Sequence, residues 1–183
     1  MLTYVILLRA VNVGSTGKLP MADFRKLLEK LGYSNVETYI QSGNAVVDAK
    51  GTAEAVAKAV GAALEKLMGK RVPVIVRTHA ELDRMIAANP FMKEASADGS
   101  RVFAVFFSAA PGDERGVELA PIVTNNPERR DRYLLAGDTL YLHLPDGAAD
   151  SKFTAQTVDR VLGVTGTARN WNTVQKLHAM AKR

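Results

Sequence analysis

The order strand, helix, strand, strand, helix, strand is predicted twice along this chain, and the repetition constrains its fold more than any other feature. Short continuous apolar runs indicate strands, and apolar residues that recur every three or four positions indicate helices. In the first half the predicted elements are a strand at 3–9, a helix at 21–31, strands at 36–40 and 45–48, a helix from 52 to 68, and a strand at 72–77. This order is typical of the ferredoxin-like unit, in which two helices cover one face of an antiparallel sheet.

Residues that favour turns and helix ends mark these boundaries. Pro20 suits a first helical position, where its missing N–H costs nothing, and Gly32 suits the left-handed residue that follows a helix. Thr52 can cap the second helix. Pro73 cannot donate a hydrogen bond to a neighbouring strand, so the strand at 72–77 is expected at an edge of its sheet.

The second half repeats the element order but no obvious residue identity. Its predicted elements are a strand at 101–107, a helix at 113–120 ended by Pro121, strands at 131–135 and 139–144 around Gly137 and Asp138, a helix capped by Asp150 or Ser151, carrying Phe153 and ended by Gly163, a strand at 164–169, and a helix at 171–181. Thr78 and Glu81 form a capping box that begins a connecting helix, which Pro90 stops. The small, polar segment 93–100 is expected to be flexible.

We therefore predict an α+β fold of two tandem ferredoxin-like (βαββαβ) halves with antiparallel sheets, plus a connecting helix and a C-terminal helix. The first half is expected at 1–78, the connecting helix and loop at 79–100, and the second half with the C-terminal helix at 101–183. Because 5–8 and 102–107 are apolar at both parities, both faces of these central strands are expected to be covered.

Composition excludes several classes of protein. The 183 residues are 47% hydrophobic, with no cysteine and no apolar run long enough to span a membrane. The lack of cysteine excludes disulfides, thiolate metal sites and thiol nucleophiles. No signal peptide precedes the first strand, so a cytoplasmic protein with no membrane partner is expected. No cofactor is expected either.

The net charge of +5 leaves room for an anionic partner. Basic residues cluster at three places, namely Lys66, Lys70 and Arg71, then Arg129, Arg130 and Arg132, then Lys176, Lys182 and Arg183. Such clusters are common on solvated surfaces, and a nucleic-acid partner requires them on one face. Stacking of bases on a sheet is disfavoured, because 45–47 carries no aromatic residue and Phe103 and Phe107 are expected in the core.

A polar edge is predicted in the first half. In a βαββαβ unit the first strand ends where the hairpin between the next two strands turns, so 9–18 is expected beside 41–44. The residues expected to line a shallow site there are Arg9, Asn12, Gly14, Lys18, Gln41, Ser42, Gly43 and Asn44. Cationic side chains together with amide and backbone N–H donors favour a small anion, phosphate or carboxylate. In the alternative, structural interpretation, Asn12 and Asn44 complete turns and Arg9 pairs with a carboxylate.

Known catalytic patterns are not recognised. The stretch 12–19 lacks the glycine and the Ser or Thr of a nucleotide P-loop, because Asn12 and Leu19 stand at those positions. His79, His143 and His178 are scattered without metal-ligand spacing, so no metal site is expected, and His79 and His178 are assigned to surface or packing roles.

Three functions remain open. The first is a binding module for a small anionic ligand at the polar edge. The second is an enzyme that acts on a phosphorylated or carboxylated small molecule at the same edge, with no catalytic residue assigned. The third is nucleic-acid binding through the basic loops.

A second group of candidate residues is Arg169, Asn170 and Trp171. Asn170 suits a helix N-cap, and Trp171 combines a large apolar surface with one N–H donor. In one interpretation the tryptophan pins the last helix to the core. In the other, Arg169 and Trp171 form a wall of a ligand cleft between the halves.

Segments 7–14 (LLRAVNVG), 19–21 (LPM), 38–44 (TYIQSGN) and 167–173 (TARNWNT), the last followed by Lys176 and Leu177, together resemble the bacterial domain-of-unknown-function family 1697. These motifs span almost the whole chain. Ala10 stands where the family is expected to carry glycine, which argues against an unusual backbone conformation there. The resemblance implies a pair of ferredoxin-like halves, and it implies no known substrate, cofactor or reaction.

Overall fold

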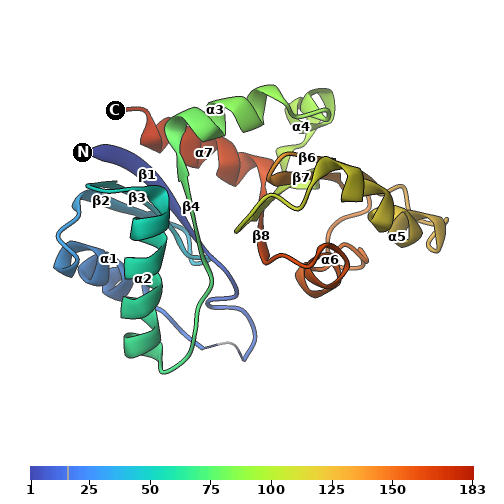
Figure 1. The fold of residues 1–183 in the computed structure, drawn as a ribbon. Coiled ribbons are helices and arrows are strands. Elements are labelled where there is room, and N and C mark those ends of the chain that lie inside the picture. Colours follow the sequence, from blue (N-terminus) through green and yellow to red (C-terminus); the bar gives the residue numbers. More distant parts are fainter. Residues whose placement is uncertain (16) are drawn as a thin grey trace. The chain divides into compact units, whose positions relative to one another are not determined.

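The computed structural model describes residues 1–15 and 17–183, which form two compact units (Figure 1). Unit 1 comprises Met1–Arg84 together with Lys176–Arg183, and unit 2 comprises Met85–Gln175. Within the described residues each unit holds a four-stranded antiparallel sheet, so the fold is α+β as predicted. In that same part of the chain, no helix combines the length and apolar character that a membrane crossing requires.

The sheet of unit 1 has the strand order β2-β3-β1-β4, with each neighbouring pair antiparallel. Its elements are β1 (Leu2–Leu8), α1 (Met21–Lys30), β2 (Ser34–Tyr39), β3 (Asn44–Ala49), α2 (Ala53–Met68) and β4 (Val74–Thr78). Phe24 and Leu28 of α1 and Leu64 of α2 are fully buried in one cluster with Tyr4 and Ile6 of β1. Because Tyr4 and Ile6 share one face of the strand, both helices pack on that face.

The boundaries of unit 1 follow the local signals in its sequence. The Oγ1 of Thr52 accepts a hydrogen bond from the N–H of Ala55 at 3.2 Å and so caps α2. Gly32 follows α1 with a φ of +82°. Strand β4 lies at an edge of the sheet, which confirms the interpretation of Pro73.

The capping box that follows β4 is also confirmed. The N–H of Thr78 donates to Oε2 of Glu81 at 2.7 Å, and the N–H of Glu81 donates to Oγ1 of Thr78 at 3.2 Å. Helix α3 (His79–Ala87) begins there.

Central strand β1 is buried on both faces, since Val5, Ile6 and Leu7 are each 0% exposed.

Unit 2 has the strand order β6-β7-β5-β8, which is the order of unit 1 repeated with the next four strands. Its elements are α4 (Met92–Ala97), β5 (Val102–Phe107), α5 (Ala120–Thr124), β6 (Arg132–Ala136), β7 (Thr139–His143), α6 (Ala155–Leu162) and β8 (Gly166–Asn170), with 3-10 turns at Gly99–Arg101 and Asp113–Leu119. Phe107, Leu119, Leu140 and Leu162 are fully buried in its core. Helix α7 (Trp171–Ala181) follows β8 and contributes residues to both units.

The first part of unit 2 differs from the sequence-based picture at two places. The segment 93–100, expected to be flexible, lies mostly in α4 and in the 3-10 turn that Asp98 caps through the N–H of Ser100 at 3.0 Å. Pro121 does not end a helix; it lies in the first turn of α5. A proline fits there because the N–H it lacks has no partner within the helix.

The start of α6 was also predicted wrongly. The helix begins at Ala155, and its cap is Thr154, whose Oγ1 accepts the N–H of Thr157 at 3.1 Å. Phe153 precedes the helix instead of lying on it. Ser151 was expected to cap, but its hydroxyl donates to Oδ2 of Asp131 at 2.8 Å. Several residue types able to cap stand in this stretch, and tertiary contacts decide which of them does.

Candidate functional site

Three connections of unit 1 meet at one end of its sheet, where β1 finishes and β4 begins. The N–H of Leu8 donates to the carbonyl of Gly43 at 2.8 Å, and the N–H of Arg9 donates to the carbonyl of Pro73 at 3.1 Å. The chain at the end of β1 therefore contacts both the β2–β3 turn and the segment before β4. The sequence predicted the first of these contacts. We call this region the loop edge and define it as residues 9–15, 17–20, 40–43 and 69–73.

The side chain of Asn12 connects two segments of the loop edge. Its Oδ1 accepts the N–H of Leu19 at 2.7 Å, and its Nδ2 donates to the carbonyls of Leu19 at 2.9 Å and Gln41 at 2.7 Å. The side-chain amide is thus occupied by backbone groups. Asn12 positions the two loops, as in the structural interpretation of this residue.

Asn44 and its neighbours have a similar role in the β2–β3 turn. Asn44 is 0% exposed, and its Nδ2 donates to the carbonyl of Tyr39 and to Oγ of Ser42, both at 2.9 Å. Gly43 has a φ of +85°, and a Cβ there would lie 2.6 Å from Cγ2 of Val11. These residues shape the turn, so the groups that face solvent must come from elsewhere on the loop edge.

Arg9, Gly14 and Gln41 occupy more open positions. Arg9 is half-buried at the end of β1, and burial lowers the pKa of its guanidinium from the ordinary value. Gly14 is exposed with a φ of +52°, and a Cβ there would meet nothing within 4 Å. Gln41 is exposed and borders a hollow of about 620 Å³, which Gly14 also lines.

The loop after β1 uses left-handed backbone at alternate residues. Ala10 has a φ of +54°, Asn12 of +56° and Gly14 of +52°. Asparagine and glycine tolerate this region, whereas alanine rarely adopts it. The sequence argued against an unusual conformation at Ala10, and that expectation was wrong. The tertiary contacts of the loop impose the conformation in spite of the side chain.

An Ala10→Gly variant is therefore expected to be more stable than the native chain, by about 0.5–1 kcal/mol, because glycine relieves the left-handed strain at some cost in chain entropy. Urea denaturation followed by circular dichroism measures the difference. An Ala22→Gly variant, in helix α1, is the control and should be less stable than the native chain. A loss of stability in the Ala10 variant would contradict the strained conformation.

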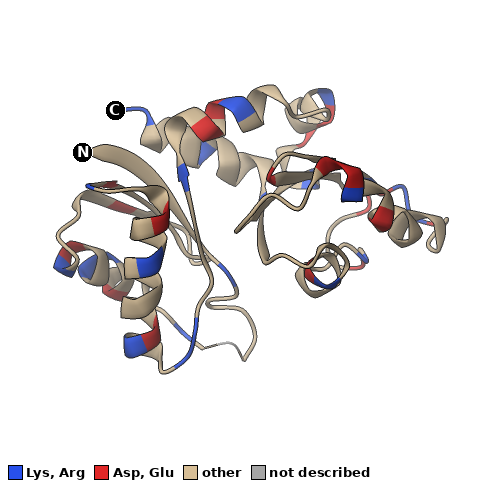
Figure 2. Ribbon diagram, viewed as in Figure 1, with Lys and Arg blue, Asp and Glu red and all other residues tan. Residues whose placement is uncertain are grey.

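Basic residues occur at the end of α2 and along the adjoining loops of the loop edge (Figure 2). Lys18, Lys70 and Arg71 are all exposed. The Nζ of Lys70 reaches across to the loop, 3.3 Å from the point where a Cβ on Gly17 would lie. Lys18 borders the hollow of about 620 Å³ beside Gln41, and it also borders a second hollow of about 390 Å³ beside Lys70.

The N-terminus of α1 opens on the larger hollow. Pro20, Met21 and Ala22 line it, and among the described residues no side chain caps this helix end. The first N–H groups of a helix have no partner within the helix and carry partial positive charge. Asp23, in the same first turn, borders the smaller hollow.

The second predicted group of residues lies around the start of α7. Oδ1 of Asn170 accepts the N–H of Thr173 at 3.0 Å, which confirms Asn170 as the helix cap. Trp171 is 0% exposed, and its indole nitrogen has no hydrogen-bond partner among the described residues. Arg169 is also buried; its guanidinium donates to Oγ1 of Thr167 at 2.8 Å, and burial lowers its pKa to about 10. The burial of Trp171 agrees with the interpretation in which it packs the last helix against the core. The alternative, in which Arg169 and Trp171 form a wall of a ligand cleft, stays a prediction.

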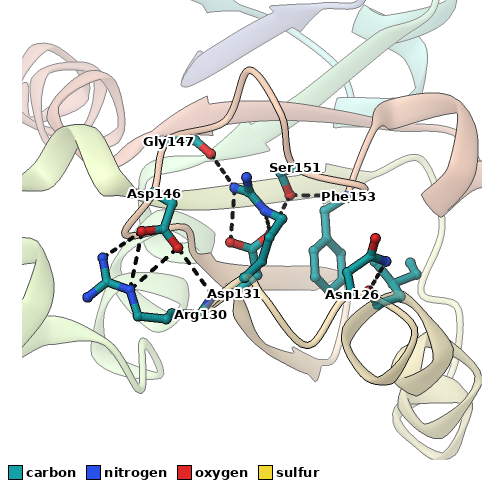
Figure 3. Close-up of polar contacts among 9 residues, drawn as sticks. Asn126, Arg130, Asp131, Asp146, Gly147, Ser151 and Phe153 are labelled. Carbon is teal, nitrogen blue, oxygen red and sulfur yellow. Dashed lines mark hydrogen bonds and ion pairs between the residues drawn. The ribbon is translucent and has the colours of Figure 1, made fainter.

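The basic cluster in unit 2 is paired with carboxylates (Figure 3). Arg130 contacts Asp146 at 2.6 Å, and Nε of Arg129 donates to Oδ2 of Asp131 at 2.9 Å. Arg132 forms an ion pair with Glu94. These three cations are thus largely neutralised within unit 2. Sequence spacing did not reveal the network, since two of its carboxylates come from other elements.

Two of the histidines meet in unit 1. His79 and His178 both contact Asp83, and their rings stack with centroids 4.5 Å apart. The four-residue spacing of His79 and Asp83 was the one signal visible in the sequence. His143 lies in unit 2 beside Arg132, and burial together with that positive charge lowers its pKa.

Comparison with known proteins gives a fold and a family. A search of curated proteins found no match. Among solved structures, the conserved bacterial protein SP0830 from Streptococcus pneumoniae is similar, with a TM-score of 0.68, 19% identity and coverage of 99% of each chain. At that identity the likeness concerns the fold alone. The model of the family described as "Protein of unknown function (DUF1697)" matches residues 1–141, and the chain therefore belongs to this family.

Proposed function

We propose that unit 1 binds a small anionic ligand, carrying phosphate or carboxylate, in the larger hollow of the loop edge. The observation that carries this proposal is the N-terminus of α1, which opens on the hollow without a side-chain cap among the described residues. Unpaired N–H groups and the helix dipole favour an anion at such a position. Met21 and Ala22 provide the backbone that faces the ligand.

Side chains around the hollow add to this preference. Lys18 supplies a full positive charge, and the exposed amide of Gln41 supplies a hydrogen-bond donor. Left-handed φ values recur at Ala10, Asn12 and Gly14, and the N–H of Asn12 donates to the carbonyl of Gly17 at 3.1 Å, so the loop holds its own shape beside the hollow.

The distribution of acidic residues favours the larger hollow over the smaller one. Asp23 borders the smaller hollow, where its carboxylate repels an anion. Among the described residues that line the larger hollow there is no carboxylate. Lys18 borders both hollows, and it shares the smaller one with Asp23 but the larger one with no acidic residue among those described.

Substituting Lys18 tests the proposal directly. The melting temperature of the native chain is expected to rise with a panel of phosphate, pyrophosphate, nucleotides and citrate, and a Lys18→Gln variant is expected to bind the stabilising anion about tenfold more weakly. Lys50→Gln is the matched control, because Lys50 is exposed and follows β3 at the opposite end of the sheet. No stabilisation by any member of the panel would refute the proposal.

An Ala22→Asp variant separates binding from folding. A carboxylate in the first turn of α1 is expected to stabilise the helix by about 0.3–1 kcal/mol through the helix dipole. The same carboxylate occupies the anion position, so affinity for the anion is expected to fall at least tenfold. Isothermal titration calorimetry and urea denaturation report the two effects. Retained affinity in this variant would show that the anion binds elsewhere.

The two alternative functions, an enzyme and a nucleic-acid-binding protein, differ in how well the structure supports them. An enzyme acting on a phosphorylated or carboxylated small molecule would use the same hollow, and turnover lost in Lys18→Gln without unfolding is its test. Nucleic-acid binding through the basic loops has less support, because Arg129, Arg130 and Arg132 are engaged with carboxylates. Salt-dependent retention on heparin is the measurement that would favour it.

The fold also supports a finer inference. We infer that each unit is ferredoxin-like and that the chain is a tandem of two such units. The shared strand order and the helical crossover between the first and second strands of unit 1 support this inference.

A further inference from the structure

Two histidines and an aspartate from helices far apart in the sequence meet in unit 1. His79 and Asp83 lie one turn apart on α3, and His178 comes from α7. Oδ2 of Asp83 is 3.2 Å from Nδ1 of His79, and Oδ1 of Asp83 is 2.6 Å from Nε2 of His178. The ligand atoms of the three residues all lie within 4.8 Å of one another.

We propose that His79, Asp83 and His178 bind a divalent transition-metal ion of the Zn²⁺ type, which joins α3 to α7. Imidazole nitrogen and carboxylate oxygen are both ordinary ligands of Zn²⁺, at about 2.0–2.2 Å. Ligand atoms placed tetrahedrally at that distance are roughly 3.3 Å apart. The distance of 3.2 Å between Oδ2 of Asp83 and Nδ1 of His79 already matches this spacing. The distance of 2.6 Å between Oδ1 of Asp83 and Nε2 of His178 needs to lengthen by less than about 1 Å. Two nitrogen donors disfavour Ca²⁺ and Mg²⁺, which prefer oxygen.

The orientation of the rings suits a shared ion. The rings of His79 and His178 stack with an interplanar angle of 17°, and Nδ1 of His79 and Nε2 of His178 both contact the carboxylate of Asp83. Nε2 of His79 is buried without a hydrogen-bond partner among the described residues, which leaves Nδ1 as its ligand atom. The three side chains are 27–54% exposed, so water can complete a tetrahedral shell.

The charges around the cluster act in both directions. The carboxylate of Asp83 is 54% exposed and supplies the negative charge that favours a bound cation. Lys182 also lies near Asp83, and its positive charge opposes a bound cation. Removal of this charge is therefore expected to strengthen metal binding.

Titration of the full chain with ZnCl₂ in a calorimeter tests the proposal. One equivalent is expected to bind, with affinity at least tenfold lower in Asp83→Asn and in His178→Ala, and higher in Lys182→Gln. CoCl₂ is expected to give visible absorption bands of a tetrahedral site in the native chain and not in these two ligand variants. Asp83→Asn is nearly isosteric and exposed, so it preserves the fold, which far-UV circular dichroism checks.

The matched control is His143→Ala, which removes the histidine of unit 2 and is expected to leave Zn²⁺ affinity unchanged. The proposal is overturned if the native chain binds no Zn²⁺, if Asp83→Asn and His178→Ala bind it as tightly as the native chain, or if His143→Ala abolishes binding. The Lys18→Gln variant is expected to bind Zn²⁺ normally, which separates this site from the loop edge.

Discussion

A Gly43→Ala variant is expected to lose about 2–4 kcal/mol of unfolding free energy relative to the native chain. Alanine at a φ of +85° costs about 1–2 kcal/mol, because its Cβ crowds the following carbonyl. The new Cβ would also lie 2.6 Å from Cγ2 of Val11 and 2.8 Å from Cβ of Leu8. Overpacking of this kind commonly costs about 1–3 kcal/mol. Urea denaturation followed by far-UV circular dichroism measures the loss.

Gly32→Ala provides the control for backbone strain alone. Gly32 has nearly the same φ, +82°, and a Cβ there would meet nothing within 4 Å. Its substitution is expected to cost only the strain of about 1–2 kcal/mol. Equal losses in the two variants would show that the close approach of the turn to β1 has no energetic weight. A larger loss in Gly43→Ala, with weaker anion binding, would link the packing of the turn to the geometry of the loop edge.

An Asp131→Ala variant is expected to destabilise unit 2 by about 2–4 kcal/mol, because a buried, fully hydrogen-bonded carboxylate is removed and its partners are left unsatisfied. Asp131 is 6% exposed, and it accepts hydrogen bonds from Arg129 and from Ser151 (Figure 3). Ser151 in turn accepts the N–H of Phe153 at 3.2 Å, so the network holds the segment that leads into α6. Fluorescence of Trp171, the one tryptophan of the chain, reports the unfolding of unit 2.

Asp146→Ala is the matched control in the same cluster. Asp146 pairs with Arg130, whose side chain is 72% exposed, and solvent screens such a pair. Its removal is therefore expected to destabilise unit 2 much less than Asp131→Ala. If the two substitutions had the same effect, burial would not be what gives the Asp131 network its strength.

The two sites proposed for unit 1 lie at opposite ends of its sheet. Strand β1 ends at the loop edge, and β4 begins beside it, since Leu8 pairs with Val74. At its other end β4 pairs Thr78 with Tyr4 and leads directly into His79. The length of the sheet thus separates the anion hollow from the histidine cluster. Effects of Lys18→Gln on metal binding, or of Asp83→Asn on anion binding, are expected to be small.

Elements with strong local signals were predicted well. The capping box at Thr78 and Glu81, the cap at Thr52 and the edge strand after Pro73 each depend on backbone chemistry within a few residues. Convergence of the loop after β1 with the β2–β3 turn also followed from element order, because a helical crossover fixes which strand ends share an edge. The failures lay where two local signals competed, as at Pro121 and at the start of α6.

Sequence spacing thus predicted the α+β architecture, the order of the elements and the convergence of the loop after β1 with the β2–β3 turn. Only the folded chain decided which polar groups bind backbone and which face solvent, since Asn12 and Asn44 are occupied by hydrogen bonds while Lys18 stays exposed. The left-handed Ala10 and the meeting of His79 with His178 likewise depend on contacts between distant segments. The physical reason is that local propensity amounts to a few tenths of a kcal/mol per residue, whereas packing and long-range hydrogen bonds amount to several times more.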